Sequence, residues 1–197
     1  MKVVVTGGTG MIGRKLIDSL LAMPELIDRD GNLAEVTAIT AFDVVAPNPP
    51  LPDDPRLTIV TGEISDAEAV EALIDDDTDT VFHLAAVVSA QAEEDFDLGM
   101  RVNLDGTRIT LERCRALGHV PRVVYASSVA AFGGNMPDVI NDTVTPNPQT
   151  TYGVTKVIVD LLGQKWSGQA YQSVQVCKCV KLTRVLITHC RHRSHTR

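Results

Sequence analysis

A tyrosine and a lysine one helical turn apart are the residues of this sequence whose types and spacing best suit catalysis. Tyr152 and Lys156 stand four positions apart, so on a helix they share one face. A phenol, with an ordinary pKa of about 10, is a poor base at neutral pH. A neighbouring ammonium favours the phenolate and lowers that pKa, so Tyr152 can take a proton from a substrate hydroxyl. The same spacing also occurs by chance on solvated helix faces, so its meaning depends on its context.

Two serines supply part of that context. Ser127 and Ser128 directly follow a β-branched run at 121–126, which predicts a buried strand. Ligands of open α/β sheets bind at the carboxyl ends of the strands. A serine hydroxyl there can donate to a substrate oxygen and stabilise developing charge. The alternative is an ordinary loop serine that satisfies backbone groups.

A glycine-rich turn near the N-terminus points to a nucleotide. Residues 6–13 read Thr-Gly-Gly-Thr-Gly-Met-Ile-Gly, between an apolar strand and an amphipathic helix. In such a motif Gly7 permits the tight turn, Gly10 lets the backbone approach a pyrophosphate, and Gly13 lets the helix pack closely. The helix N-terminus then offers N–H groups to the phosphates. The context favours dinucleotide binding over a merely structural turn.

An acidic residue indicates which dinucleotide is bound. Asp43 ends the second predicted strand, where a carboxylate can accept both ribose hydroxyls. Its charge would repel a 2′-phosphate, and Val44, Val45 and Ala46 supply no arginine to hold one. NAD is therefore favoured over NADP as the cofactor. The alternative is that Asp43 only caps the following loop.

The elements that must position these residues alternate along the chain. Ser65 and Asp66 predict a helix start, with Glu68 completing a capping box, and prolines between residues 47 and 55 exclude regular structure there. Alternating strands and helices predict an α/β fold with a doubly wound parallel sheet, the Rossmann fold. The predicted strands are 2–6, 35–42 (followed by Asp43), 57–60, 80–84 and 121–126, and the predicted helices are 12–21, 65–74, 103–117 and one from about 152.

Composition limits the remaining classes of protein. A chain of 197 residues that is 44% hydrophobic and 22% charged can hold one packed domain. It has no apolar stretch long enough to span a bilayer. The N-terminus leads directly into a core strand and lacks the pattern of a signal peptide. We therefore expect a cytoplasmic protein that does not bind membranes.

Charge divides the chain near residue 165. Up to Gln164 there are 11 basic and 25 acidic residues, whereas residues 165–197 carry seven basic and no acidic residues. This division predicts a nucleotide-binding domain at 1–164 and a basic tail at 165–197 that we assign to no fold. The cysteines and histidines of the tail match no zinc spacing, so no metal is expected. Few aromatic residues accompany its charges, so no nucleic acid is expected either.

Several motifs together resemble a known family. Besides residues 6–13, the chain contains His83-Leu-Ala-Ala, Asn103-Leu-Asp-Gly-Thr, the Ser127-Ser128 pair and the Tyr152-x-x-x-Lys156 pair in this order. This set resembles the extended short-chain dehydrogenase/reductases, the NAD-dependent epimerase/dehydratase group. The stretch 83–103 resembles its D-erythronate dehydrogenase branch, whose members oxidise the 2-hydroxyl of a four-carbon sugar acid with NAD. The resemblance covers about residues 1–164.

The resemblance implies roles for individual residues. Tyr152 would be the acid/base, and Lys156 would lower its pKa and hold the nicotinamide ribose. Ser128 rather than Ser127 would contact the substrate, and Ser89 and Gln91 would meet the substrate carboxylate. Where the family often has an aspartate near the adenine, this chain has Glu63. The implied cofactor-binding residues are Gly7, Gly10, Met11, Ile12, Gly13, Asp43, Glu63, Ile64, Leu84, Ala85, Ala86, Asn103, Tyr152 and Lys156.

The resemblance also marks where this chain departs from the family. Family members continue past the tyrosine-lysine helix into a smaller C-terminal substrate domain, which is missing here. A frameshift or aberrant splice near Lys165 would explain the reversed charge of the tail. Three readings stay open: an NAD-dependent dehydrogenase of sugar acids, a nucleotide-sugar epimerase or dehydratase, and a non-catalytic NAD-binding fragment. The helices after Asn103 and around Tyr152 also allow a homodimer, as in relatives, although an exposed sheet edge can instead cause aggregation.

Overall fold

The computed structural model describes all residues except 24, 29, 120, 142, 170–173 and 178–197. Its centre is a six-stranded sheet in the order β5-β4-β1-β6-β7-β8, and every pair of neighbours in it is parallel. The predicted parallel Rossmann sheet is confirmed. Its strands are β1 (Lys2–Thr6), β4 (Ala38–Asp43), β5 (Leu57–Thr61), β6 (Thr78–His83), β7 (Arg122–Ala126) and β8 (Val174–Cys177).

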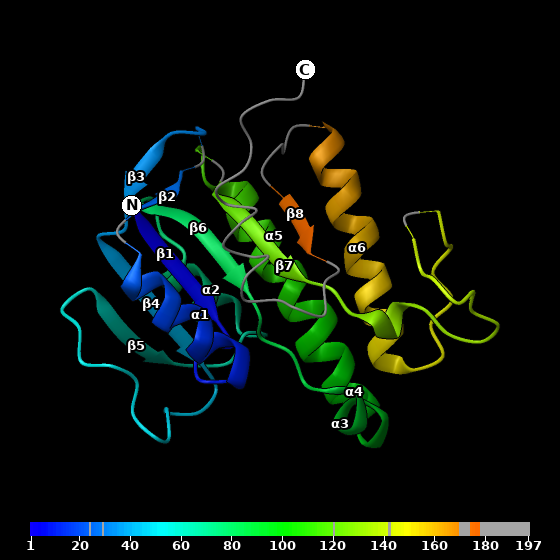
Figure 1. Ribbon diagram of the computed structural model, residues 1–197. Coiled ribbons are helices and arrows are strands. Elements are labelled where there is room, and N and C mark those ends of the chain that lie inside the picture. The colour runs from blue at the N-terminus through cyan, green and yellow to red at the C-terminus, as the bar shows by residue number, and fades with distance from the viewer. Residues whose placement is uncertain (24, 29, 120, 142, 170–173, 178–197) are drawn as a thin grey trace.

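Helices cover both faces of this sheet (Figure 1). Helix α1 (Met11–Ala22) packs Leu16, Ile17 and Leu20 against one face, where Val3 and Val5 of β1 point. Helices α2 (Ala67–Leu73) and α5 (Gly106–Ala116) cover the other face, and their apolar residues surround Val4. Successive side chains of β1 point to opposite faces of the sheet. Because helices cover both faces, Val3, Val4 and Val5 are all buried, which explains the continuous apolar run of this strand.

The predicted second strand is wrong at its start, where the structure has a small hairpin. The prediction ran from Glu35 to Phe42, but Glu35 belongs to β3 (Leu33–Glu35), which pairs antiparallel with β2 (Glu25–Ile27). Between these two strands Asp28 accepts the N–H groups of Asp30 and Asn32 and closes the turn. The sheet strand β4 therefore begins only at Ala38.

The helix start near residue 65 also differs from the prediction. Asp66, not Ser65, caps α2, and its side chain accepts the N–H groups of Glu68 and Ala69. The capping box proposed for Ser65 and Glu68 is therefore wrong. A carboxylate at the cap also suits the positive end of the helix dipole.

The predicted helix at 103–117 is preceded by further helical turns. Helices α3 (Ser89–Glu94) and α4 (Phe96–Gly99) lead into a π-helical segment, η1 (Met100–Asp105), which continues directly as α5. Asp95 caps α4 by accepting the N–H of Leu98. Asn103 therefore lies within a π-helical turn, a feature that occurs frequently at functional sites.

The predicted domain boundary at residue 164 falls inside a helix. Helix α6 runs from Thr151 to Gln169, and β8 then adds a parallel strand beside β7. The predicted basic tail therefore contains the end of helix α6 and the strand β8 of the sheet. Most of the cysteines and histidines of the tail lie outside the described residues.

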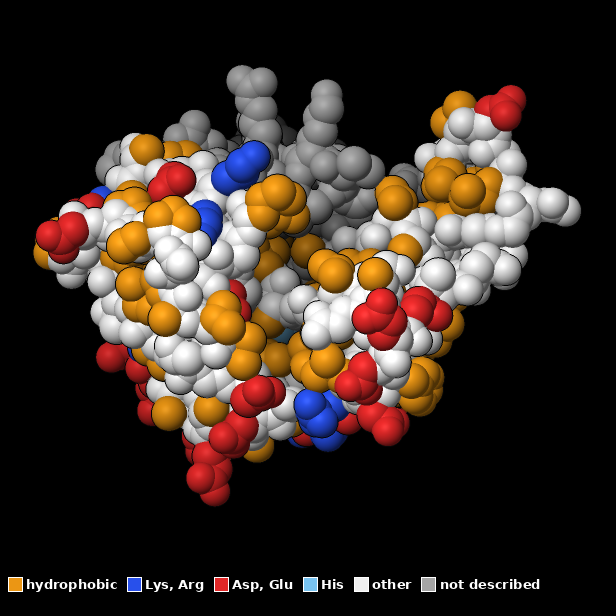
Figure 2. Space-filling model, turned by 90° about the horizontal axis from the view of Figure 1, so that it is seen from below, with side chains coloured by type: hydrophobic (Ala, Val, Ile, Leu, Met, Phe, Trp, Pro, Cys, Tyr) orange, Lys and Arg blue, Asp and Glu red, His pale blue; other side chains and the backbone are white. Residues whose placement is uncertain are grey.

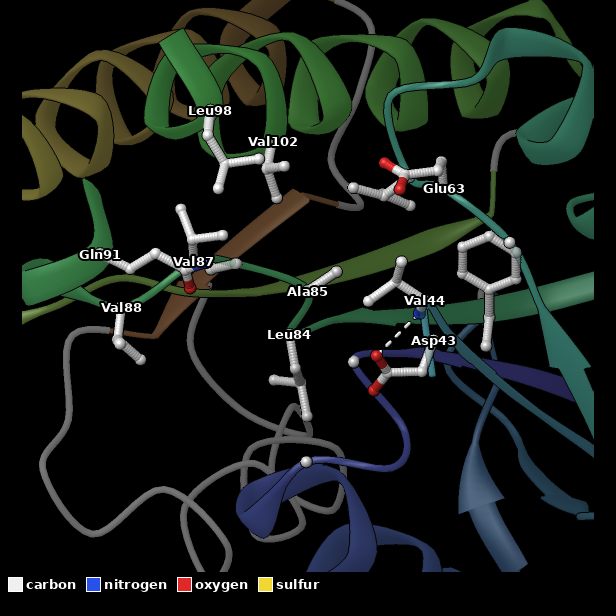
Figure 3. A pocket seen from close by; sticks show the side chains of 16 residues that line it. Asp43, Val44, Glu63, Leu84, Ala85, Val87, Val88, Gln91, Leu98 and Val102 are labelled. Carbon is white, nitrogen blue, oxygen red and sulfur yellow. Dashed lines mark hydrogen bonds between the residues drawn. The ribbon is translucent and has the colours of Figure 1, made fainter. Parts of the chain in front are cut away.

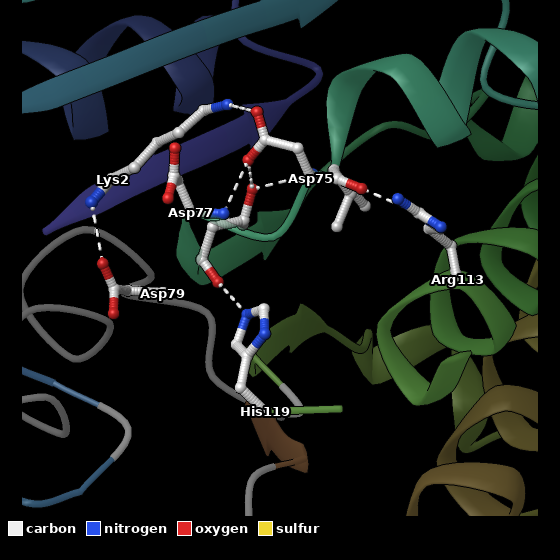
Figure 4. A network of polar contacts seen from close by, with 8 residues as sticks. Lys2, Asp75, Asp77, Asp79, Arg113 and His119 are labelled. Atoms are coloured by element: carbon white, nitrogen blue, oxygen red, sulfur yellow. Dashed lines mark hydrogen bonds and ion pairs between the residues drawn. The ribbon is translucent and has the colours of Figure 1, made fainter. Parts of the chain in front are cut away.

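The amino ends of the strands are joined by polar contacts (Figure 4). Lys2 pairs with Asp75 through its ammonium, while its backbone N–H donates to Asp79 at 2.9 Å. His119 Nε2 contacts the carbonyl oxygen of Thr78 at 2.9 Å, and Arg113 donates to Ile74 O at 2.7 Å. These contacts tie loops to the amino ends of the strands. Within the described part of the chain, no helix has the length and apolar character needed to cross a membrane.

Candidate active site

A cavity of about 460 Å³ opens at the carboxyl ends of the strands. It lies where the chain order reverses between β1 and β6, the usual ligand position in such sheets. Seen from this side, the molecule is hollowed between apolar side chains (Figure 2). Its walls include these predicted residues: Gly7, Gly10, Asp43, Glu63, Ile64, Leu84, Ala85, Ala86 and Gln91.

The cavity also has walls that the sequence patterns did not indicate. Phe42, Val44, Gly62, Val87, Val88, Leu98 and Val102 complete it, and Figure 3 shows Leu98 and Val102 facing Val87 and Leu84 across the space. Phe42 lies near the end of β4. The other residues come from loops and from the turns before α5, where an isolated apolar residue carries no positional signal. Met11, Ile12, Gly13, Asn103 and Ser89 are not among the lining residues.

The glycine turn brings backbone unusually close to backbone. Gly7 has φ of +70°, and a Cβ there would lie 2.8 Å from the Ala85 nitrogen. A Cβ on Gly13 would lie 2.2 Å from the Gly7 carbonyl oxygen. The first turn of α1 therefore packs directly on the loop. Gly10 caps this helix without any side-chain hydrogen bond, so its first N–H groups face the cavity edge as a phosphate requires.

Asp43 is held at the end of β4 by two backbone contacts. Its Oδ2 accepts the N–H of Thr9 at 3.0 Å, and its Oδ1 accepts the N–H of Val44 at 2.8 Å. The second contact is drawn in Figure 3. Each carboxylate oxygen retains further acceptor capacity. The side chain therefore lines the cavity in a fixed orientation that suits a pair of ribose hydroxyls.

A buried histidine fixes the loop on the other side of the cavity. His83 is 1% exposed and lies between Thr6 Oγ1 on Nδ1 and Thr107 Oγ1 on Nε2, both at 2.9 Å. Thr107 gives its proton to the Asn103 carbonyl at 2.7 Å, so Nε2 of the ring must be the donor to Thr107. Thr6 Oγ1 accepts from the N–H groups of Leu84 and Ala85, so it donates to Nδ1.

This pattern assigns a neutral ring to His83. Burial lowers the pKa of His83 to about 3, with a smaller contribution from the charge of Lys156. Asn103 extends the network, because its amide bonds both the N–H and the carbonyl oxygen of Val87 at 2.9 and 3.1 Å. Asn103 thus lies behind the cavity wall and holds the loop that forms it. Sequence inspection noted His83 only as part of a motif.

The predicted catalytic residues come together at the end of β7. Ser128 accepts the N–H of Ala130 at 3.2 Å and caps the short helix η2 (Val129–Ala131), and its side chain is close enough to Tyr152 to oppose the rise of the Tyr152 pKa. Lys156 is 4% exposed, and its Nζ lies 5.3 Å from the centre of the Tyr152 ring. This trio does not line the cavity itself. It adjoins the α3 wall, since Thr151 at the start of α6 donates its N–H to Glu93 at 2.5 Å.

The electrostatics of the pair differ from the sequence expectation. Burial raises the pKa of Tyr152 above its ordinary value, and the hydrogen bond with Ser128 only opposes this. The predicted lowering of the Tyr152 pKa is therefore wrong in net direction for this arrangement. Burial also lowers the pKa of Lys156 to about 8, because desolvation disfavours its charge, while the nearby Asp160 opposes this change. Near neutral pH the lysine is thus close to its titration.

The two neighbouring serines have different surroundings. Ser127 is buried, and its hydroxyl donates to Asp160 Oδ2 at 2.8 Å, whereas Ser128 is oriented toward Tyr152. Sequence reasoning did not identify Asp160. The available signal was its spacing, because it follows Lys156 by four residues as Lys156 follows Tyr152.

Comparisons with known proteins agree with this geometry. The family model described as "NAD dependent epimerase/dehydratase family" matches residues 3–183, so the similarity extends past Gln164. A D-erythronate dehydrogenase of Cupriavidus necator is 48% identical over 178 residues, covering 90% of this chain and 54% of the relative. This chain therefore spans about half the length of that relative.

Solved structures show the same relation. A nucleoside-diphosphate-sugar epimerase from Agrobacterium tumefaciens superimposes with a TM-score of 0.77 at 35% identity, covering 90% of this chain and 51% of that one. A UDP-glucose 4-epimerase of Thermus thermophilus, solved with NAD, gives a TM-score of 0.73 at 28% identity, covering 90% of this chain and 54% of that one.

Proposed function

Because the chain belongs to the NAD dependent epimerase/dehydratase family, we propose that it oxidises the 2-hydroxyl of D-erythronate or a similar sugar acid, with NAD as the hydride acceptor. The observation that carries the proposal is the meeting of Ser128, Tyr152 and Lys156 beside the cavity at the end of β7. The identity of 48% with a D-erythronate dehydrogenase supports the choice of substrate.

The residues around the cavity fit NAD. The start of α1 at Gly10 has no side-chain cap and borders the cavity, which suits a pyrophosphate. Asp43 is oriented to accept ribose hydroxyls, and Glu63 and Ile64 lie on the wall where an adenine would rest. Leu84, Ala85 and Ala86 form the opposite wall. When bound, NAD supplies the acceptor for the hydride that leaves the substrate carbon.

The chain's own residues handle the proton. Tyr152 Oη removes the proton of the 2-hydroxyl as the carbon–hydrogen bond breaks, and the substrate becomes a 2-oxo acid. Ser128 donates to the substrate oxygen and keeps it next to Tyr152. The charge of Lys156 favours the phenolate form of Tyr152. Gln91 on α3 lines the cavity, which supports its assignment to the substrate carboxylate; Ser89 does not line the cavity, and its role remains the one that the resemblance implies.

Two other functions are supported by particular observations. The similarity to a nucleoside-diphosphate-sugar epimerase favours a sugar nucleotide as substrate, in which case hydride returns to the substrate and no NADH is released. The cavity is lined by Gly7, Asp43 and Glu63 but by none of Ser128, Tyr152 and Lys156, which favours binding of NAD without turnover as the second alternative.

NADH fluorescence separates these functions. The purified chain is mixed with NAD and D-erythronate, and formation of NADH is followed in parallel for Tyr152→Phe. We expect NADH from the native chain and a loss of at least about 100-fold in rate in the variant, since general acid–base groups contribute 10²–10⁴. Titration with NAD serves as the fold control, because the phenylalanine variant keeps the cavity. NAD binding without NADH formation would reject the dehydrogenase function for this chain.

A further inference from the structure

A buried carboxylate lies on the catalytic face of α6 without a role in the proposed reaction. Asp160 follows Lys156 by one helical turn and Tyr152 by two, so all three lie on one face of the helix. Only 2% of Asp160 is exposed. Aspartate is almost never buried so completely unless it is paired, so its surroundings call for an explanation.

One neighbour of Asp160 is the strand end that carries the serines. Ser127 Oγ donates to Asp160 Oδ2 at 2.8 Å, and these residues are 33 positions apart in the chain. Ser127 immediately precedes Ser128, whose side chain lies beside Tyr152. The contact therefore fixes the α6 helix against the end of β7 at the point where the catalytic residues meet.

The other neighbour is the ammonium of Lys156. Lys156 Nζ donates to the Ala126 carbonyl at 3.0 Å and lies 4.6 Å from the centre of the Tyr125 ring. The groups that face it are Tyr125 on β7, His83 on β6, and Tyr152 and Asp160 on α6. Two of these are phenols and His83 is a neutral imidazole. Asp160 is thus the carboxylate that balances the charge of the lysine.

We propose that Asp160 is a positioning residue of the catalytic centre: anchored by Ser127, its carboxylate keeps Lys156 as an ammonium ion beside Tyr152. This proposal rests on the proposed function, since it concerns the same site. Desolvation disfavours a buried ammonium, and burial lowers the pKa of Lys156 to about 8. The charge of Asp160 raises the pKa of Lys156 and so opposes this change. Without the carboxylate, Lys156 loses its proton at physiological pH.

Two single substitutions separate charge from structure. Asp160→Asn keeps an oxygen that can accept the Ser127 hydroxyl, but it removes the charge. Ser127→Ala removes the hydrogen bond of 2.8 Å but keeps the charge. If Asp160 only tied the helix to the strand, Ser127→Ala would disturb Lys156 at least as much as Asp160→Asn. If its charge acts on Lys156, only the asparagine variant will change the titration of that lysine.

The measurement is the pH titration of the lysine side-chain signals by NMR in 13C-lysine-labelled chain, with the Lys156 signal assigned through Lys156→Arg. In the native chain we expect Lys156 to titrate near pH 8. In Asp160→Asn we expect its midpoint to fall by at least about one pH unit, the usual effect of removing a close opposite charge. In Ser127→Ala we expect the midpoint to stay within a few tenths of the native value.

The outcomes decide the proposal without any turnover. An unchanged Lys156 midpoint in Asp160→Asn overturns it, and so does an equal fall in both variants. If the asparagine variant does not fold, judged by circular dichroism, the native titration still decides: a Lys156 midpoint below pH 7 would show that Asp160 does not preserve the charge. If D-erythronate is not oxidised while the titrations behave as expected, only the proposed substrate or reaction fails.

Discussion

Two buried polar clusters lie side by side at the carboxyl edge of the sheet, and they use opposite means to remain stable. The histidine cluster consists of Thr6, His83 and Thr107, and it carries no charge. The lysine cluster consists of Ser127, Lys156 and Asp160, and it contains an ammonium and a carboxylate. The histidine cluster holds a wall of the cavity, whereas the lysine cluster supports the catalytic tyrosine.

The difference follows from how each cluster satisfies its polar groups. In the histidine cluster, every proton of the ring and of the two hydroxyls has an acceptor. A second ring N–H on a protonated His83 would therefore have no hydrogen-bond acceptor. In the lysine cluster, two opposite charges compensate each other's loss of hydration. The first arrangement gives a loop whose shape does not change with pH near neutrality. The second gives a proton equilibrium near the pH at which an acid/base must work.

The largest expected effect concerns acid and the histidine cluster. The pKa of His83 in the folded chain, about 3, lies below its ordinary value of 6.5, so the unfolded chain binds the proton first. The neutral His83 ring therefore contributes fully to the free energy of unfolding above pH 6.5, and this contribution is lost as the pH falls toward 3. The whole contribution is roughly 5 kcal/mol, at 1.36 kcal/mol per pKa unit. We therefore measure the free energy of unfolding in urea at pH 7 and at pH 4. Its decrease between these pH values should be about 3 kcal/mol smaller in His83→Asn than in the native chain.

A matched histidine variant serves as the control for this experiment. His119 lies at the amino end of the sheet and contacts Thr78 O, outside the histidine cluster, so His119→Asn tests whether the effect belongs to the buried ring of His83. The ring signals of His83 in the native chain offer a second measurement, because they should stay those of a neutral imidazole down to pH 4. An equal pH dependence in His83→Asn and the native chain would contradict the neutral assignment.

The next effect concerns the charge pair of the lysine cluster. Asp160→Ala removes the counter-charge of Lys156, which then gives up its proton, and it leaves the Ser127 hydroxyl without its acceptor. Because the pKa of Lys156 is about 8, proton release limits the charge part of the cost at pH 7 to about 1.4 kcal/mol, and the lost hydrogen bond adds about 1–3 kcal/mol, so we expect a loss of about 2–4 kcal/mol in the free energy of unfolding. The loss should shrink at pH 9.5, above the pKa of about 8 of Lys156, because a neutral amine no longer needs a counter-charge. Asp18→Ala, on the exposed face of α1, should change stability by no more than about 0.5 kcal/mol. An equally large loss at both pH values would show that packing, not charge, explains the effect.

Sequence patterns predicted the elements around the cavity better than the contacts inside either polar cluster. The strand alternation and the glycine turn are local signals, so β1, α1 and the cavity edge at Gly7 and Asp43 follow from a few consecutive residues. The burial of Asp160 depends on Ser127, which lies 33 positions away. A charged residue on a helix is most often solvated, so the type of Asp160 alone gave no reason to expect its burial.

Short elements were also missed for physical reasons. The three-residue strands β2 and β3 are too short to show alternation, and their pairing depends on the turn at Asp28. At the start of α2, two adjacent residues could both cap the helix, and only backbone geometry selects Asp66. Strand β8 lies in a basic segment whose composition suggested no fold, but its edge position beside β7 provides the hydrogen bonds.

The smallest expected effect breaks one link of the histidine cluster. Thr107→Val keeps the shape of the side chain but removes the acceptor 2.9 Å from His83 Nε2, and leaving that buried donor unsatisfied should cost about 1–3 kcal/mol. Thr110→Val is the matched control: it is buried one turn further along α5 and bonds only the Gly106 carbonyl among the contacts found for its hydroxyl. It should therefore lose less, about 0.5–1.5 kcal/mol. Urea unfolding of both variants at pH 7 tests this order. The affinity for NAD, measured by titration, should fall only in Thr107→Val, because the Asn103–Val87 contact behind the cavity wall depends on the same turn. Equal losses in the two variants would mean that the network does not support the wall, and the contrast between the two clusters would then rest on the charge pair alone.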